Sequence, residues 1–140
     1  MSIDNRNQVL GYSGDEKSLR LLIVEDDTII RMVLENFSKQ KGWKVILAEN
    51  GKAGIDAYQA QEFDVIIMDC QMPVLDGYQT TGAIRQLEGQ RSRHIPIIAM
   101  TANTLKGDLE TCLNAGMDDY LTKPVDKNTF YSIVDKWTKS

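Results

Sequence analysis

The chain has 140 residues, a length that predicts a single domain with a full hydrophobic core. Hydrophobic residues make up 42% and charged residues 26%, and the net charge of -4 argues against a general affinity for nucleic acid or for anionic membranes. Apolar runs fall well short of the roughly 20 residues that a membrane helix needs, and the first residues show no signal-peptide pattern, so we expect a cytoplasmic protein.

Residues 1–18 are polar and have no hydrophobic periodicity, which predicts a linker or a disordered tail. From residue 19 to residue 140 the pattern is that of one folded domain. Short runs rich in Val and Ile alternate there with longer amphipathic segments. We predict strands at 20–25, 44–48, 64–69, 95–101 and 119–122, and helices at 28–41, 51–61, 76–88, 103–115 and 126–138.

The last predicted helix has the clearest pattern. Asp126 is placed to cap its N-terminus, and an apolar stripe follows at helical spacing. Gly42 and Gly116 come directly after two other predicted helices, where glycine commonly ends a helix. The stripe consists of Phe130, Ile133, Val134 and Trp137.

Five alternating strand and helix units predict an α/β fold with a doubly wound parallel sheet and helices on both faces. Ligands of such sheets bind outside the carboxyl ends of the strands. Polar residues lie at these ends and therefore form one candidate site. They are Glu25, Asp26, Asp69, Thr101 and Lys123.

The chemistry of these side chains indicates phosphoryl transfer. Carboxylates at Glu25, Asp26 and Asp69 would repel one another without a divalent cation such as Mg²⁺. Asp69 ends a buried apolar run, and its carboxylate can attack a phosphoryl group to form an acyl phosphate. Lys123 can pair with Asp69 before phosphorylation, and Thr101 can donate its hydroxyl to a phosphoryl oxygen. Taken alone, the acidic cluster is also compatible with a solvated loop that caps a helix.

Four motifs lie at the ends of predicted strands. They are LIVEDD at 22–27, IMDCQMP at 67–73 with DG at 76–77, AMTA at 99–102, and DYLTKP at 119–124. Together they closely resemble the receiver domains of two-component response regulators. The resemblance covers about residues 19–139 and implies the flavodoxin-like strand order 2-1-3-4-5. The residues around the site are most like those of receivers fused to hybrid sensor histidine kinases.

The resemblance also implies a metal site. Asp69 is then the phosphorylation site, and Mg²⁺ (or Mn²⁺) is held by Glu25, Asp26, Asp69 and the backbone carbonyl of Gln71. Gln71 and Asn103 occupy positions that tune hydrolysis of the acyl phosphate in this family. The family pattern gives Asp27 no ligand role, so we expect it to cap the helix that follows.

A conformational switch is implied by the same resemblance. Thr101 and Lys123 contact the phosphoryl group, and Tyr120 is the aromatic residue whose ring moves inward when Thr101 shifts. The Lys123–Pro124 bond matches one that is cis in the family.

These motifs predict a phosphoacceptor domain that takes its phosphoryl group from a phosphohistidine. The expected partners are a histidine kinase domain, a histidine phosphotransfer protein, or both, with no nucleic acid and no direct membrane contact, even where the parent kinase is membrane-anchored. The domain would catalyse its own phosphorylation and dephosphorylation without turning over an external substrate. Because no second domain follows the last predicted helix, we expect an excised hybrid-kinase receiver in a phosphorelay rather than a regulator with a DNA-binding output.

The predicted helix 28–41 offers a docking surface for such a partner. Ile29 and Met32 lie beside its core stripe, towards the exposed side, next to the acidic site. Half-buried packing is the alternative role for both residues. The core stripe is expected to contain Ile30, Val33, Leu34 and Phe37.

Three other functions are alternatives to this one. An aspartate-nucleophile phosphohydrolase of the haloacid dehalogenase type needs a second acid two residues after the nucleophile, where this chain has Gln71. Flavin binding is excluded because the acidic residues after the first strand would repel a phosphate. A stand-alone receiver that acts by protein contact stays open. Cys70 and Cys112 are expected to be free, buried thiols, and His94 is expected to have no catalytic or ligand role.

Overall fold

A computed structural model describes residues 18–89, 94–102 and 106–139. These residues form a parallel five-stranded sheet of order β2-β1-β3-β4-β5 with five helices, which confirms the predicted fold class and strand order. The strands are β1 (Arg20–Val24), β2 (Lys44–Ala48), β3 (Val65–Asp69), β4 (Ile97–Thr101) and β5 (Asp119–Thr122). The helices are α1 (Thr28–Gln40), α2 (Gly51–Ala60), α3 (Gly77–Glu88), α4 (Lys106–Asn114) and α5 (Lys127–Thr138).

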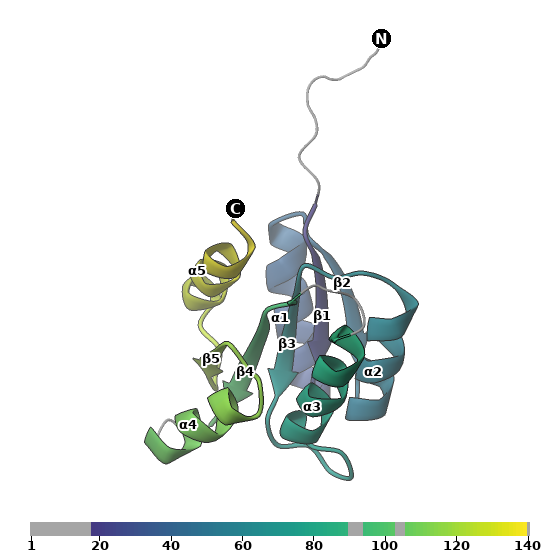
Figure 1. Ribbon diagram of the computed structural model, residues 1–140. Coiled ribbons are helices and arrows are strands. Elements are labelled where there is room, and N and C mark those ends of the chain that lie inside the picture. Colours follow the sequence, from purple (N-terminus) through teal and green to yellow (C-terminus); the bar gives the residue numbers. More distant parts are fainter. Residues whose placement is uncertain (1–17, 90–93, 103–105, 140) are drawn as a thin grey trace.

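Strands β3 and β4 are apolar up to their last residues, Asp69 and Thr101, because helices cover both faces of the sheet. Every residue of β3 and of β4 is buried, as expected for strands without polar alternation. Helices α1 and α5 cover one face, and α2, α3 and α4 cover the other. Figure 1 shows α2 and α3 side by side in front of the sheet, α1 behind it, and the strand arrowheads all pointing to one edge. The carboxyl ends of the strands, and with them the predicted site residues, therefore meet at that edge.

The helix boundaries follow the capping residues. Asp126 caps α5 by accepting a bond from the N–H of Thr129, as predicted. Asp76 caps α3 and forms a capping box with Gln79, so this helix begins one residue later than predicted. Gly42 and Gly116 have φ values of 77° and 106°, the left-handed conformation that glycine adopts readily.

Two elements differ from their predicted starts by more than one residue. Strand β4 begins at Ile97 rather than at residue 95, because Pro96 has no N–H for the ladder, although its carbonyl still accepts a bond from Ile66. The predicted helix 103–115 is observed from Lys106 to Asn114, and residues 103–105 lie outside the described part. Of the predicted tail, only Ser18 is described, and its hydroxyl donates to the carbonyl of Gly42 at 2.8 Å.

The prediction for the core stripe of α1 was wrong at one position. Leu34 is buried and Ile30 and Phe37 pack against the core, but Val33 is 40% exposed. Ser38 is buried instead, with its hydroxyl donating to the carbonyl of Leu34 at 2.8 Å. A serine whose hydroxyl bonds within its own helix can be buried without an unpaired polar group, a possibility that a hydrophobic pattern does not register.

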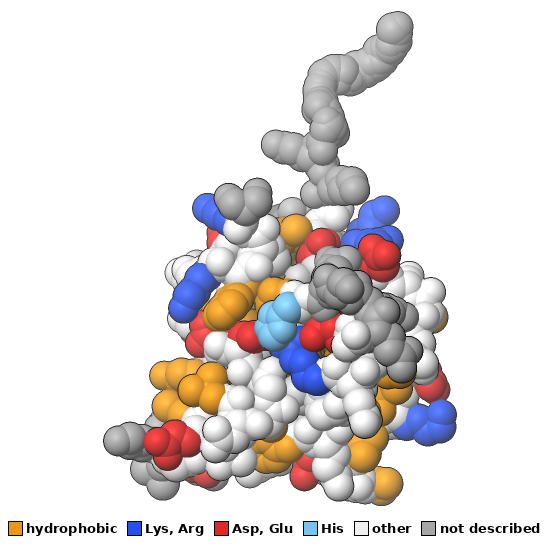
Figure 2. All heavy atoms as spheres, viewed as in Figure 1, with side chains coloured by type: hydrophobic (Ala, Val, Ile, Leu, Met, Phe, Trp, Pro, Cys, Tyr) orange, Lys and Arg blue, Asp and Glu red, His pale blue; other side chains and the backbone are white. Residues whose placement is uncertain are grey.

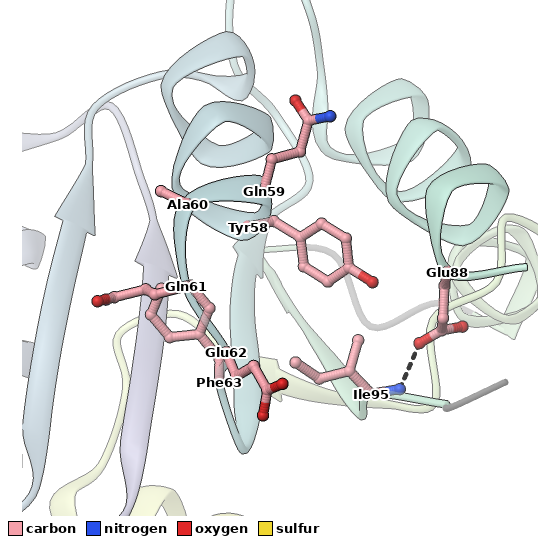
Figure 3. Close-up of a pocket in the computed structure, with 8 residues that line it drawn as sticks. All are labelled: Tyr58, Gln59, Ala60, Gln61, Glu62, Phe63, Glu88 and Ile95. Atoms are coloured by element: carbon pink, nitrogen blue, oxygen red, sulfur yellow. Dashed lines mark hydrogen bonds between the residues drawn. The ribbon is translucent and has the colours of Figure 1, made fainter. Parts of the chain in front are cut away.

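The opposite edge of the sheet is held by an ionic network. Arg85 donates to Asp118 at 2.8 Å, to both carboxylate oxygens of Glu88 at 2.9 Å, and to the carbonyl of Ile95 at 2.8 Å. His94 Nε2 lies 2.7 Å from Asp118 Oδ1. A hollow of about 530 Å³ between the ends of α2 and α3 borders this network, and the Glu88 carboxylate accepts from the N–H of Ile95 at its rim (Figure 3). These contacts hold α3 to β4 and β5 at the edge away from the predicted site.

Candidate metal and phosphoacceptor site

The acidic turn between β1 and α1 is fixed by its own backbone bonds. The N–H of Glu25 continues the sheet by donating to the carbonyl of Ala48 at 3.0 Å. The N–H of Asp27 donates to Glu25 Oε2 at 2.9 Å. Asp27 Oδ1 accepts from the N–H groups of Ile29 and Ile30, so Asp27 is the N-cap of α1, as predicted.

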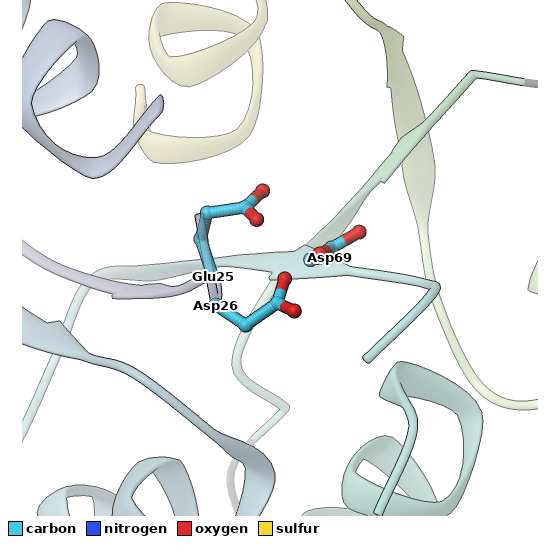
Figure 4. A group of neighbouring side chains, drawn as sticks. All are labelled: Glu25, Asp26 and Asp69. Carbon is cyan, nitrogen blue, oxygen red and sulfur yellow. The ribbon is translucent and has the colours of Figure 1, made fainter. Parts of the chain in front are cut away.

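Three carboxylates converge at this edge of the sheet. Oxygens of Glu25, Asp26 and Asp69 all lie within 4.8 Å of one another, with Glu25 and Asp69 buried and Asp26 exposed. Figure 4 shows Glu25 and Asp26 at the end of β1 and Asp69 at the end of β3, with the three side chains gathered at this edge of the sheet. The structure therefore brings together the three side-chain ligands predicted from the sequence.

Lys123 lies just after β5, where its N–H donates to the carbonyl of Thr101 at 2.9 Å. Its ammonium donates to Asp69 Oδ1 at 2.9 Å and lies 3.1 Å from Glu25 Oε1. The peptide bond between Lys123 and Pro124 is cis, as the family resemblance implied. One ammonium thus faces two buried carboxylates, which leaves the cluster with excess negative charge.

Burial and this charge imbalance shift the ionisation of the site. Burial raises the pKa of Glu25, the N–H of Asp27 opposes this, and the nearby Asp69 adds to it, with a net pKa of about 7. The pKa of Lys123 is also raised: burial alone would lower it, but its bonds to Asp69 and Glu25 outweigh burial. A buried carboxyl with such a pKa is typical of a functional site, and its ionised form would be stabilised by a bound cation.

Two buried carboxylate oxygens of the cluster accept no hydrogen bond from the residues that the structure describes. Within the described residues, Asp69 Oδ2 is buried and accepts no hydrogen bond. Glu25 Oε1 also has no hydrogen bond, although the Lys123 ammonium lies close to it. A buried, unpaired carboxylate oxygen is destabilising unless a ligand satisfies it. The all-oxygen donor set fits a hard divalent cation such as Mg²⁺, which binds one or two carboxylates and keeps several waters.

The loop after β3 presents Asp69 through tight backbone contacts. The N–H of Gln71 donates to Asp69 Oδ1 at 3.1 Å, and the N–H of Gly77 donates to the carbonyl of Cys70 at 3.2 Å. A Cβ atom at residue 77 would lie 2.1 Å from the carbonyl oxygen of Asp69. Only glycine lets the start of α3 approach this closely, so Gly77 sets the position of the Asp69 peptide.

Thr101 and Tyr120 lie on neighbouring strands beside Asp69. Asp69 pairs with Met100 in the sheet, so Thr101 is one residue further along β4. Thr101 is buried, whereas Tyr120 is 40% exposed and lines a cavity of about 250 Å³ between α4 and β5. Figure 2 shows a patch of hydrophobic side chains over α4 and β5, where Leu113 and Tyr120 are exposed.

The predictions for the two cysteines, for the exposed side of α1 and for Asn103 compare with the structure as follows. Cys70 and Cys112 are free and buried, as predicted, but their sulfur atoms lie 3.7 Å apart, which the sequence did not indicate. Burial raises the pKa of the Cys70 thiol to about 12. Ile29 and Met32 are exposed on α1, and Asn103 lies outside the described residues.

The comparisons with known proteins agree with this geometry. The family model for the response regulator receiver domain matches residues 21–135, so the chain belongs to the receiver domain family. The sensor histidine kinase GacS of Pseudomonas protegens is 40% identical over 120 residues, with 85% of this chain and 13% of the relative covered. The hybrid signal transduction histidine kinase I of Dictyostelium discoideum is 37% identical over 121 residues, with 83% and 7% covered. The chain therefore spans only a small part of these relatives.

Solved structures show the same fold. The receiver domain of a Pseudomonas aeruginosa sensor histidine kinase, with a magnesium ion coordinated in its active-site cleft, superposes with a TM-score of 0.80 at 41% identity, covering 89% of this chain and all 100% of that one. A Saccharomyces cerevisiae receiver domain, crystallised with its histidine phosphotransfer protein, superposes with a TM-score of 0.81 at 31% identity, covering 86% and 89%. Within the described residues, none of the helices is both long and apolar enough to cross a bilayer.

Proposed function

We propose that this receiver domain accepts a phosphoryl group from a phosphohistidine onto Asp69 in the presence of Mg²⁺. The observation that carries the proposal is the buried carboxylate of Asp69, which ends the central strand and has one oxygen without a partner beside two further acids. Glu25, Asp26 and Asp69 would hold the cation together with the backbone carbonyl of Gln71. The bound cation would neutralise the charge that develops on the phosphoryl oxygens.

The chain's own residues supply the rest of the transfer. An Asp69 carboxylate oxygen attacks phosphorus, the phosphorus–nitrogen bond of the phosphohistidine breaks, and the imidazole leaves with the bonding electrons. The Lys123 ammonium, 2.9 Å from Asp69 Oδ1 before transfer, then faces a phosphoryl oxygen. The Thr101 hydroxyl donates to another. Gln71, exposed beside the site, and Asn103 are proposed to govern how quickly water hydrolyses the product.

Intact mass spectrometry with a small phosphodonor tests this proposal directly. Acetyl phosphate and Mg²⁺ should add one phosphoryl group, and omitting Mg²⁺ should greatly slow the addition. A protein that binds Mg²⁺ but gains no phosphoryl group from acetyl phosphate or from a phosphohistidine donor would refute the proposal. Continuous release of phosphate from many phosphate esters would favour a phosphohydrolase instead.

The proposed response to phosphorylation is a shift of Thr101 and Tyr120. Thr101 would move to hydrogen-bond the new phosphoryl oxygens, and the Tyr120 ring would fill the space that it leaves. Tyr120 is half-exposed next to a cavity, so its ring is not locked in the packed core. The face formed by α4, β5 and α5 would change as a result, through a shift in population between two states.

Thr101→Ala should uncouple this switch from phosphorylation. The variant is expected to accept phosphate on Asp69, because the nucleophile and the acidic cluster are intact, but its Tyr120 ring should stay exposed. Fluorine NMR of a fluorotyrosine at position 120, recorded before and after phosphorylation, would report the ring. Equal shifts in the variant and in the wild type would contradict a role for Thr101.

A histidine phosphotransfer protein is the partner that we propose for this site. The exposed side chains of Ile29, Met32 and Val33 form an apolar shoulder on α1 beside the acidic turn, as expected for a surface that receives a helix. The yeast receiver described above was crystallised with a protein of this kind. The hybrid signal transduction histidine kinase among the relatives supports a hybrid-kinase parent, and for the domain itself we propose a cytoplasmic location.

Met32→Glu should weaken phosphotransfer from a histidine phosphotransfer protein while leaving phosphorylation by acetyl phosphate intact. A buried, unpaired carboxylate at a docked interface would oppose binding. Leu113→Glu is the matched control, because Leu113 is 57% exposed on α4 and Met32 is 59% exposed on α1. Unchanged phosphotransfer by Met32→Glu, or an equal loss in Leu113→Glu, would show that α1 is not the docking surface.

A further inference from the structure

Arg31 is a cation at an electrostatically unfavourable place in α1. It is the fourth residue of the helix, where the helix dipole and the unpaired N–H groups favour anions. The Asp27 carboxylate caps the N–H groups of Ile29 and Ile30, and the first turn itself contains no acidic side chain that could pair with Arg31. A residue that breaks a local rule in this way indicates a role outside the helix itself.

The contacts of Arg31 show where that role lies. Its Nη1 donates to the backbone carbonyl of Glu25 at 2.7 Å, and its Nη2 donates to the hydroxyl of Thr28 at 3.2 Å. The carbonyl of Glu25 belongs to the peptide group that joins Glu25 to Asp26. The guanidinium therefore fixes the peptide plane from which the Asp26 side chain leaves, and it ties this plane to the start of α1.

We infer that Arg31 is a positioning residue for the divalent cation. It keeps the Glu25–Asp26 peptide oriented so that both carboxylates stay turned towards Asp69 before a cation binds. The inference rests on the proposed function, since it takes Mg²⁺ as the ligand of the acidic cluster.

The need for such a residue follows from the charges of the site. Three carboxylates with oxygens within 4.8 Å of one another repel, and this repulsion favours rotation of the exposed Asp26 away from the cluster. Two other hydrogen bonds of the turn hold the Glu25 N–H and the Glu25 carboxylate. Arg31 holds the carbonyl with a charge-assisted hydrogen bond. A turn that is already ordered loses less conformational entropy when the cation binds.

The direction in which the Mg²⁺ dissociation constant changes when Arg31 is removed separates this positioning role from a simple charge effect. If Arg31 acted only through its positive charge, removing it would strengthen Mg²⁺ binding, because like charges repel. If Arg31 positions the acidic turn, removing it weakens Mg²⁺ binding. The two accounts therefore predict opposite shifts in the dissociation constant.

Isothermal titration of Mg²⁺ into the metal-free protein measures this shift. Arg31→Ala is expected to weaken Mg²⁺ binding about tenfold, the lower end of the effect seen when an outer partner of a metal ligand is removed. Arg31→Lys should weaken Mg²⁺ binding less. An ammonium can replace the bond to the Glu25 carbonyl, but it cannot reproduce the guanidinium's simultaneous contacts with Glu25 and Thr28. Lys39→Ala, which removes a cation from the last turn of the same helix, should leave binding unchanged.

Phosphorylation by acetyl phosphate gives a second readout. The Mg²⁺ concentration for half-maximal rate should rise in Arg31→Ala in parallel with the dissociation constant, while the rate at saturating Mg²⁺ stays near that of the wild type. Arg31→Met keeps much of the aliphatic stem and removes both donors, so it decides the question if the alanine variant does not fold.

Three outcomes would overturn the inference. Unchanged or tighter Mg²⁺ binding in Arg31→Ala or Arg31→Met would do so, as would an equal weakening in Lys39→Ala. A wild-type protein that binds no Mg²⁺ would overturn the proposed function and this inference together. A wild type that binds Mg²⁺ and is insensitive to Arg31 would overturn the inference alone.

Discussion

Asp69→Asn is expected to abolish phosphorylation by both acetyl phosphate and a phosphohistidine donor. The amide has nearly the same shape as the carboxylate but cannot act as the nucleophile that forms an acyl phosphate. The variant should stay folded, because Lys123 keeps Glu25 as a partner and the loss of a buried charge relieves repulsion in the acidic cluster. Intact mass after incubation with donor and Mg²⁺ measures the effect.

Asp27→Asn is a closely matched control for this experiment. It makes the same change, from a carboxylate to an amide, in the acidic turn between β1 and α1, two residues after Glu25. Asparagine caps a helix about as well as aspartate, so the bonds to the N–H groups of Ile29 and Ile30 should persist. The control should be phosphorylated like the wild type. A phosphoryl group that still appears in Asp69→Asn, or one lost in Asp27→Asn, would contradict the assignment of Asp69.

The sequence predicted the fold and the gathering of the site because both depend on simple patterns. The apolar run of β3 has every residue buried between two helical layers, and such a run has one natural place in a parallel sheet. Once the strands are parallel, the residues that follow them must share an edge. Asp69, Glu25 and Lys123 were therefore expected to meet. The Lys123 ammonium lies 2.9 Å from Asp69 Oδ1 and 3.1 Å from Glu25 Oε1.

Contacts between distant side chains were not predictable in this way. No motif in the sequence marks Arg31 or Arg85, yet each donates to a backbone carbonyl outside its own helix. The neighbouring sulfur atoms of Cys70 and Cys112 come from segments 42 residues apart in sequence. Val33 falls on the apolar stripe but is exposed, because the packing of α1 against the sheet buries Ser38 instead. These features depend on how helices are rotated and seated, which periodicity fixes only roughly.

The combined variant Glu25→Gln and Asp26→Asn is expected to remove Mg²⁺ binding. Two of the three carboxylates that face one another would become neutral amides, and a hard cation binds charged oxygens in preference to these. The metal-free variant should be at least as stable as the wild type, because a buried carboxylate with a raised pKa and its repulsion from Asp69 are removed. Lys123 keeps its bond to Asp69.

Thermal unfolding with and without Mg²⁺ measures this directly. A ligand that binds only the folded state at a hundredfold excess over its dissociation constant stabilises a protein by about 2.7 kcal/mol, so Mg²⁺ should raise the melting temperature of the wild type by several degrees. The combined variant should show no such rise.

The control for this experiment neutralises two acids that are unrelated to the site. Glu35 and Asp56 form surface pairs with Lys39 and Lys52, and exposed pairs of this kind contribute little to stability. Glu35→Gln with Asp56→Asn makes the same change in net charge, so its Mg²⁺ response should match that of the wild type. If the Glu25 and Asp26 variant still responds to Mg²⁺, the cation binds elsewhere. If the control loses its response, overall charge rather than the acidic cluster governs binding. Only a loss confined to the first variant assigns the cation to the carboxylates around Asp69.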